Sequence, residues 1–132
     1  MKYLNNFIVF NFKAFAKGKQ FVLKEITEWK DFETKEVLGS KVTLTIVVDD
    51  TIYQTKDGEE EGVNQYEWLT IKVRQPLDKF NGWKRNDKIK VARIEKASVY
   101  GDYQNQLSII GDVFNETKPD LNYFEFKKPL ER

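Results

Sequence analysis

The chain of 132 residues contains neither cysteine nor histidine. Disulfides are therefore excluded, as are zinc sites built from cysteine and histidine ligands. Without histidine, the chain cannot use a serine or cysteine nucleophile activated by a histidine base, nor metal-assisted hydrolysis that depends on histidine ligands. The glycine-rich phosphate-binding motifs of P-loop and dinucleotide-binding proteins are also missing. These absences remove most of the common enzymatic sites.

Long apolar runs are missing too. No stretch approaches the roughly 18–20 consecutive apolar residues of a membrane helix. The apolar stretch from Phe7 to Phe10 is too short for the core of a signal peptide, and no small-residue cleavage site follows it. The sequence therefore predicts a cytoplasmic protein without a membrane partner, and its length predicts a single folded domain.

Carboxylates are the one class of catalytic group that the chain has in number, with 21 Asp and Glu residues. No pair of them stands at a spacing typical of an acid–base site or a metal site. We therefore predict that the protein is not an enzyme and has no cofactor or metal. A nuclease that holds its metal with carboxylates alone is the remaining enzymatic alternative.

Short runs of alternating apolar and polar residues, separated by polar turns, dominate the sequence. The alternation predicts strands over residues 20–30, 41–48, 65–74, 88–94 and 106–113. A short helix or turn is expected over residues 77–83, and Asp57-Gly58 marks the tip of an acidic hairpin arm. This pattern predicts an all-β fold, a five-stranded Greek-key barrel of OB type with a short helix or turn between strands 3 and 4 and extended termini.

Three parts are expected along the chain: a tail over residues 1–18, the OB-fold domain over 19–116 and a C-terminal extension over 117–132. The tail is more apolar than a free segment should be, through Phe7, Phe10, Phe12 and Phe15. It either adds a strand to the edge of its own barrel or serves as an oligomerisation arm on a neighbouring subunit. Part of the C-terminal extension is expected to dock through Tyr123, Phe124 and Phe126.

The net charge is only +1, but charges of opposite sign are separated along the chain. Residues 72–96 carry nine basic and three acidic side chains, a net charge of +6. Residues 49–67 carry seven acids against the single base Lys56, a net charge of −6. Such segregation can present one basic surface to a polyanion, although both segments can equally be ordinary solvated surface.

The third predicted strand is the most informative part of the sequence. If Leu69, Ile71 and Val73 face the core, the two-residue period of a strand places the intervening side chains together on the outer face. These side chains are Tyr66, Trp68, Thr70, Lys72 and Arg74. Rings can stack on unpaired bases for roughly 1–3 kcal/mol each, while the cations neutralise phosphates. The competing interpretation is that Trp68 is core, covered by the acidic arm or a terminal segment.

Further candidates surround this face. Lys90 and Arg93 of the basic fourth strand, expected beside the third, add phosphate contacts. Rings in the predicted barrel loops could line the same groove, and these are Trp29, Tyr53, Tyr100 and Tyr103. Phe80 and Trp83 are expected to cap the bottom of the barrel. The sequence thus predicts sequence-independent binding of single-stranded DNA, and leaves duplex DNA and RNA open. A protein-interaction module for a relaxase, helicase or coupling protein is the alternative.

A resemblance to bacterial single-stranded DNA-binding proteins covers roughly residues 65–113. The segments Tyr66-Glu-Trp-Leu-Thr-Ile-Lys-Val73 and Lys84-Arg-Asn-Asp-Lys-Ile-Lys-Val91 resemble the middle of that family. There the tryptophan at the position of Trp68 stacks on DNA. Asn86 stands where the family usually has glycine, and the chain lacks the family's long linker and acidic tip, so recruitment of replication proteins through a tail is not expected.

A second resemblance is carried by Glu28-Trp-Lys-Asp-Phe-Glu-Thr-Lys-Glu-Val-Leu-Gly39 and Ala97-Ser-Val-Tyr-Gly-Asp-Tyr-Gln-Asn-Gln-Leu107. These segments are similar to the small OB-fold accessory proteins of conjugative plasmids and integrative elements of Gram-positive bacteria, the PrgE-like and YdcP-like proteins. That resemblance implies a DNA-binding protein of conjugative transfer or plasmid replication. It also implies chains of subunits along DNA, joined through the N-terminal tail.

Overall fold

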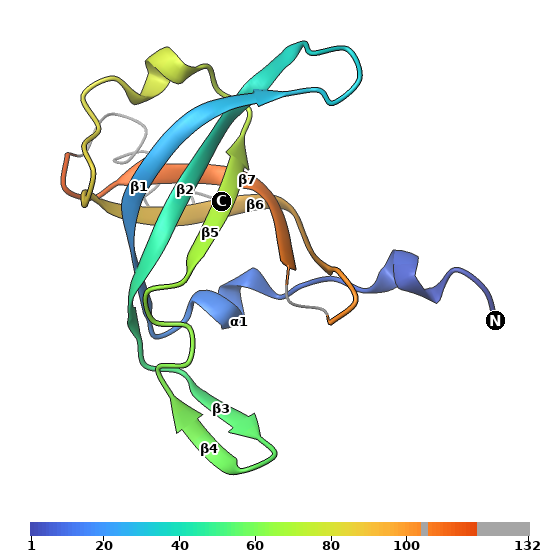
Figure 1. Ribbon diagram of the computed structural model, residues 1–132. Coiled ribbons are helices and arrows are strands. Elements are labelled where there is room, and N and C mark those ends of the chain that lie inside the picture. The colour runs from blue at the N-terminus through green and yellow to red at the C-terminus, as the bar shows by residue number, and fades with distance from the viewer. Residues whose placement is uncertain (104–105, 119–132) are drawn as a thin grey trace, which may run out of the picture.

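The computed structural model describes residues 1–103 and 106–118, apart from the side chains of residues 5 and 6. The described residues form five long strands, a small hairpin and three short helices (Figure 1). The long strands are β1 (Lys19–Lys30), β2 (Val37–Asp49), β5 (Trp68–Val73), β6 (Lys88–Tyr100) and β7 (Gln106–Asn115). The hairpin consists of β3 (Ile52–Thr55) and β4 (Gly58–Glu61), and the helices are η1 (Leu4–Phe7), α1 (Phe12–Ala16) and η2 (Leu77–Phe80).

The five long strands form one sheet that closes on itself into a ring in the order β1-β2-β5-β7-β6. All neighbours are antiparallel except β5 and β7, which run parallel. The ring is completed where β1 pairs with β6, at Phe21–Ile89 and Val22–Lys88. The predictions of a mostly-β fold, of five main strands and of a short helix between the third and the fourth are confirmed.

The interior of the ring is the hydrophobic core, and alternation along the strands fills it. On β2, Val42, Leu44 and Ile46 point inward, while on β5 the buried side chains are Leu69, Ile71 and Val73. The set on β5 is the one that the alternation predicted to face inward. Each such side chain contributes roughly 1.5–3 kcal/mol when it leaves water, so the two strands fix which of their side chains face outward.

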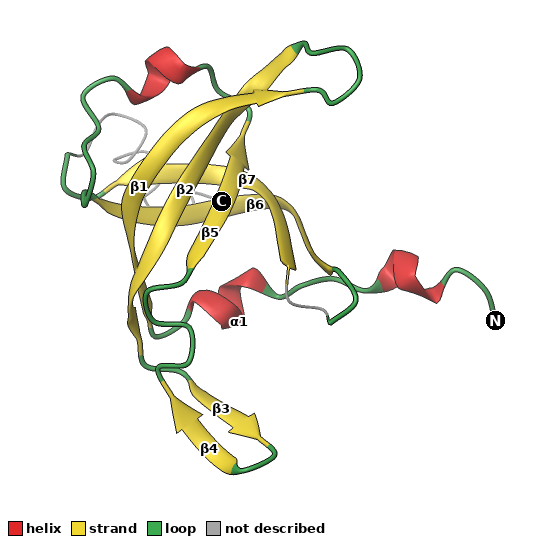
Figure 2. Ribbon diagram, viewed as in Figure 1, coloured by secondary structure: helices red, strands yellow, loops and turns green. Residues whose placement is uncertain are grey.

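Two short helices cover the two ends of the ring (Figure 2). At one end η2 inserts Phe80 into the core, where Trp83 packs against it at 4.8 Å between ring centroids, as predicted for these two residues. At the other end α1 inserts Phe12, which is 5% exposed and lies 6.3 Å from the ring of Phe21. Residues 12–16 therefore form a helix, and not the extra strand that was one of the two alternatives, because Phe12 packs into the open end of the ring.

The phenylalanines assigned to an oligomerisation arm divide into two groups. Phe12 belongs to the core of its own chain, and Phe10 and Phe15 are half-buried against it. The Phe10 backbone N–H also donates to the Ala97 carbonyl oxygen at 3.2 Å. Only Phe7 of the four is fully on the surface. An intermolecular role for Phe12 is therefore wrong in this conformation, because the side chain is already buried.

Strand boundaries differ from the predicted ones for local reasons. The predicted third strand starts at residue 65, but β5 begins at Trp68, since Tyr66 adopts a left-handed backbone (φ 71°) that ends the preceding turn. The predicted fourth strand stops at residue 94, whereas β6 continues to Tyr100. A bulge between Ala92 and Lys96 bends β6 without ending it.

The turn before β6 contains the residue that differs from the glycine of the single-stranded DNA-binding family. Asn86 lies in the left-handed region with φ 73°, which asparagine tolerates better than other non-glycine residues. Its N–H donates to the Leu23 carbonyl oxygen at 2.8 Å. The next residue, Asp87, is buried and accepts from the Lys84 N–H and the Asn115 side-chain amide, both at 2.8 Å. The departure from glycine therefore leaves the turn intact.

A buried ion pair joins the ring to the β3–β4 arm and to α1. Lys19 Nζ lies 3.3 Å from Asp49 Oδ1, and neither side chain is exposed to solvent. Lys19 also donates to the carbonyl oxygen of Phe15 at 2.8 Å, at the end of α1. Asp49 Oδ2 accepts from the Tyr53 hydroxyl at 2.9 Å and from the Asn64 N–H at 3.0 Å, on the two sides of the arm. One carboxylate thus fixes the base of the arm, which projects away from the ring (Figure 1).

The stability of the protein is expected to fall in acid through Asp49. Burial acts to raise the pKa of this carboxyl, but hydrogen bonds from Tyr53, Asn64, Thr51 and Lys19 outweigh it and lower the pKa to about 2, from an ordinary value of 3.8. A lowered folded-state pKa stabilises the fold fully above the unfolded pKa, and this stabilisation is lost as the pH falls through the folded pKa. We expect a loss on the order of 2 kcal/mol between about pH 4 and pH 2. Urea unfolding at a series of pH values measures it, and an Asp49→Asn variant should lack this part of the pH dependence.

The C-terminal extension from residue 119 onward lies outside the described residues, and so does its predicted docking through Tyr123, Phe124 and Phe126. Within residues 1–103 and 106–118, no helix has the length and apolar character to cross a membrane.

Candidate functional site

A groove of about 810 Å³ opens where β5 and β7 diverge. The two strands pair only at Ile71–Ile109 and Lys72–Ile110, so their remaining lengths separate and leave the outer face of the sheet hollowed. Strands β1, β2 and β5 supply Glu25, Lys41, Thr43, Trp68, Leu69, Thr70 and Lys72 to its lining. Strands β6 and β7 supply Ser98, Tyr100, Gln106, Leu107, Ser108 and Ile109.

Trp68 is the largest side chain of the groove and is 64% exposed. It begins β5 and points outward because its neighbour Leu69 points into the core. Neither the acidic arm nor the N-terminal segment buries it, while the C-terminal segment from residue 119 onward lies outside the described residues. The ring contacts one cation, because Lys24 Nζ lies 3.8 Å from its centroid. A large ring held outward beside cations can stack on another flat ring.

Two lysines lie directly opposite each other on the outer face. Lys41 of β2 pairs in register with Lys72 of β5, and the row beside them holds Thr43 and Thr70, whose hydroxyl oxygens are 3.1 Å apart. Like charges at opposed positions repel each other, which costs a fraction of a kcal/mol. Neither lysine forms an ion pair with another described residue. An anion bound between Lys41 and Lys72 would therefore reduce the repulsion between their ammonium groups.

A second cleft continues the groove beyond Trp68. It has a volume of about 580 Å³ and shares four lining residues with the groove: Trp68, Leu69, Gln106 and Leu107. Its lining is mixed: Phe10 and Phe15 of the N-terminal segment lie there together with the polar residues Asn64 and Glu67. Trp68 therefore lines both of two adjoining hollows, one with lysines and threonines and the other with phenylalanines and polar side chains.

Two rings predicted for the site lie elsewhere. Tyr66 is exposed in the turn before β5 and lines neither hollow, because its left-handed backbone breaks the alternation that would have aligned it with Trp68. Trp29, predicted to lie in a loop, is inside β1 and only 8% exposed. It pairs with Gly39, where a Cβ would collide with the Val73 carbonyl oxygen. The ring also lies beneath two cations, with Lys72 Nζ 5.6 Å and the Arg74 guanidinium 5.4 Å from its centroid, so it is not free to stack on a base.

Arg74 is held by an acidic partner. It follows the end of β5, and its Nε and Nη2 donate to the two carboxylate oxygens of Glu95 at 2.8 and 3.1 Å. This hydrogen-bonded pairing lowers the pKa of Glu95 and raises that of Arg74. Its guanidinium also lies 5.4 Å from the centroid of Trp29. Arg74 therefore contributes less free positive charge to the outer face than Lys41 or Lys72.

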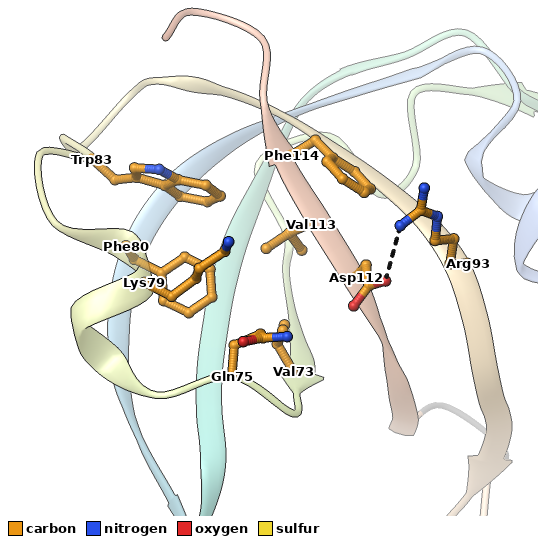
Figure 3. A pocket seen from close by; sticks show the side chains of 9 residues that line it. All are labelled: Val73, Gln75, Lys79, Phe80, Trp83, Arg93, Asp112, Val113 and Phe114. Carbon is orange, nitrogen blue, oxygen red and sulfur yellow. Dashed lines mark ion pairs between the residues drawn. The ribbon is translucent and has the colours of Figure 1, made fainter. Parts of the chain in front are cut away.

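The expectation that the basic fourth strand lies beside the third is wrong. Strand β7 lies between β5 and β6, so Lys90 and Arg93 are not next to the Trp68 groove. Lys90 lines a separate cleft between β1 and β6. Arg93 lies in the bulge of β6, 4.0 Å from Asp112 and beside Phe114, at a pocket that shares no lining residue with the groove (Figure 3). The prediction fails because the chain crosses over between β5 and β6. The neighbour of β5 in the sheet is therefore β7.

The three predicted tyrosines have different surroundings. Tyr53 supports the arm, because its hydroxyl donates to Asp49 and accepts from the Asn64 side chain at 2.9 Å. Tyr100 ends β6 and is 54% exposed. It is the one predicted loop ring that lines the same groove as Trp68 within the described part of the chain. Tyr103 is exposed in the following turn, next to residues outside the described part of the chain.

Two lysines were not among the predicted site residues: Lys41, which lines the groove, and Lys24, which contacts the ring of Trp68. Lys41 could have been found, because the alternation of residues 41–48 already places it on the outer face. Lys24 could not, since it is an extra residue in β1: Leu23 pairs with Leu44 and Glu25 with Thr43, which leaves Lys24 unpaired in a bulge. Both Lys24 and Glu25 therefore project toward the outer face, which a regular strand does not allow.

No group of three or more carboxylates is close enough to hold a metal ion within the part of the chain that the structure describes. No family model matches this sequence, and no curated protein or solved structure is significantly similar to it.

Proposed function

We propose that the closed sheet is an OB-type Greek-key barrel that binds single-stranded DNA without sequence specificity. The strand order, the parallel pairing of β5 with β7 and the position of η2 between β5 and β6 support this assignment. In such barrels the ligand lies across the second and third strands, which are β2 and β5 in this chain. The Trp68 groove occupies that face.

The observation that carries the proposal is the exposed Trp68 beside the opposed lysines Lys41 and Lys72. A stacked base removes the tryptophan from water, and each phosphate that meets a lysine releases condensed counterions. Tyr100 adds a second ring on the far wall of the groove. Both rings are more than half exposed, which is more typical of an open binding face than of an enclosed pocket for one small molecule.

Replacement of Trp68 by leucine is expected to weaken binding of a labelled oligo-dT by on the order of 10–100-fold, because one base–ring stack is lost. Fluorescence anisotropy of the oligonucleotide measures the affinity without relying on the three tryptophans of the protein. The wild-type affinity should also fall steeply as salt is raised.

The matched control is Tyr66→Leu, which removes a ring of similar exposure two residues earlier that does not line the groove. Its affinity should stay within about twofold of the wild type, as for most surface substitutions. Equal losses of oligo-dT affinity in Tyr66→Leu and Trp68→Leu would contradict the assignment of the groove as the binding site. A wild-type protein that does not bind oligo-dT at low salt would contradict the function itself.

The biological setting rests on the resemblance of the sequence to accessory proteins of conjugative elements. We place the protein in conjugative transfer or replication of a mobile element, as a homo-oligomer on the transferred strand. The exposed apolar residues Phe7, Ile8 and Val9 favour a contact with another protein surface, either a second copy or a relaxase, helicase or coupling protein. If the protein is only an interaction module, substitution of these residues abolishes a pull-down while nucleic acid has no effect.

A further inference from the structure

We propose that Lys24 covers the stacking face of Trp68 in the free protein and moves to a phosphate when a base takes its place. This inference rests on the proposed single-strand binding and assigns a second task to the site. Lys24 is then the residue that couples base stacking to phosphate neutralisation.

The position of Lys24 follows from the strand order. Its backbone is in β1 and Trp68 is in β5, with β2 between them. Because Lys24 Nζ lies 3.8 Å from the centroid of an outward-pointing ring, the side chain crosses the outer face of β2 to reach it. The bulge at Lys24 makes this direction possible. A ligand that lies across β2 and β5 meets the lysine side chain on its path.

The ammonium group of Lys24 occupies the position above the indole ring where a stacked base would lie. An ammonium at this distance leaves no space for a second flat ring on the same face of the indole. A lysine held over an exposed ring contributes only a modest attraction, and each base stack contributes more. Replacement of the lysine by a base on this face of Trp68 is therefore favourable in free energy once a single strand binds. Lys24 forms no ion pair within residues 1–103 and 106–118, so the displaced ammonium is available for a phosphate.

Two opposing effects follow for Lys24→Ala. The variant loses one phosphate contact, which makes the slope of log affinity against log salt shallower by about 0.7. It also exposes the Trp68 face in advance, which favours stacking by about 2–5-fold. At low salt the variant should bind more weakly than the wild type, and at high salt, where phosphate contacts are screened, more tightly. The two salt titrations are expected to cross.

Lys41→Ala is the matched control, because Lys41 lies on the same face without covering Trp68. Its salt dependence should also become shallower, and its affinity should stay below that of the wild type over the range in which Lys24→Ala exceeds it. A Lys24→Ala protein that binds oligo-dT no better than Lys41→Ala at any salt concentration would overturn the proposal.

Nuclear magnetic resonance tests the displacement directly. In the free protein, ring current from Trp68 should move the ε-methylene resonances of Lys24 upfield of their position in Trp68→Leu. Added oligo-dT should return them toward the position in that variant. Binding with the resonances still upfield would mean that the base stacks elsewhere, which overturns this inference alone. A wild-type protein that binds no oligo-dT at low salt overturns the proposed function and this inference together.

Discussion

An Asp49→Asn variant is expected to lose about 3 kcal/mol of unfolding free energy, the range observed when one partner of a buried ion pair is removed. The amide can still accept the hydrogen bonds of Tyr53 and Asn64, but it leaves the ammonium of Lys19 in a buried place without a counter-charge. Domains of this size are stable by roughly 5–15 kcal/mol in total, so the loss is a large fraction. Urea unfolding followed by circular dichroism measures it.

A double-mutant cycle separates the ion pair from the other roles of Asp49. Lys19→Met removes the charge and keeps an unbranched side chain that is only one atom shorter. If the lost stability comes from an unpaired ammonium, Lys19→Met combined with Asp49→Asn should be more stable than Asp49→Asn alone. The single and double variants would be equally unstable if Asp49 acted only through the arm. An unchanged unfolding free energy in Asp49→Asn would show that the network contributes nothing.

Removal of residues 1–15 is expected to destabilise the ring by at least 3 kcal/mol, whereas removal of residues 1–9 should leave its stability nearly unchanged. The longer deletion removes Phe12 from the core and the Phe15 carbonyl oxygen from Lys19. Loss of a buried phenylalanine side chain alone typically costs about 3–5 kcal/mol. The shorter deletion removes exposed residues, among them Phe7, Ile8 and Val9.

Phe12→Ala is the control that keeps the chain length, and it should reproduce most of the loss caused by the longer deletion. The shorter deletion then becomes the clean test of oligomerisation, since the ring stays folded. Sedimentation should give a lower mass for it than for the full chain if residues 1–9 join subunits. Equal masses would assign the exposed apolar residues to another partner. Equal stability of all three variants would contradict the role of Phe12 in the core.

Local patterns in the sequence predicted the features that depend on residues close together in the chain, namely strand faces, turns and the short helix. The alternation of Leu69, Ile71 and Val73 correctly placed Trp68 outward, because burial of one face leaves a strand no other register. The arm with its Asp57-Gly58 tip follows from turn chemistry, and β3 and β4 pair around it. The short helix η2 follows from the proline at position 76 and the polar residues after it.

What the sequence could not predict depends on pairing between distant segments. The strand order places β7 beside β5, so Lys90 and Arg93 do not line the groove although β6 is the next long strand after β5 in sequence. The bulge that directs Lys24 toward Trp68 depends on the register between β1 and β2, which periodicity within β1 does not encode. Phe12 reads as part of an apolar tail, and its burial becomes visible only once the end of the ring is formed.

The β3–β4 arm offers a site for an optical probe. Its two strands pair only with each other in the described part of the chain, and its tip at Asp57 is exposed, so an attached dye would not disturb the ring. Because the chain contains no cysteine, Asp57→Cys would create the single thiol of the protein. The network around Asp49 fixes the stem that carries the dye. Energy transfer from a labelled arm to a labelled oligonucleotide can therefore test the proposed binding and, where it occurs, measure how far the end of the oligonucleotide lies from a fixed point on the protein.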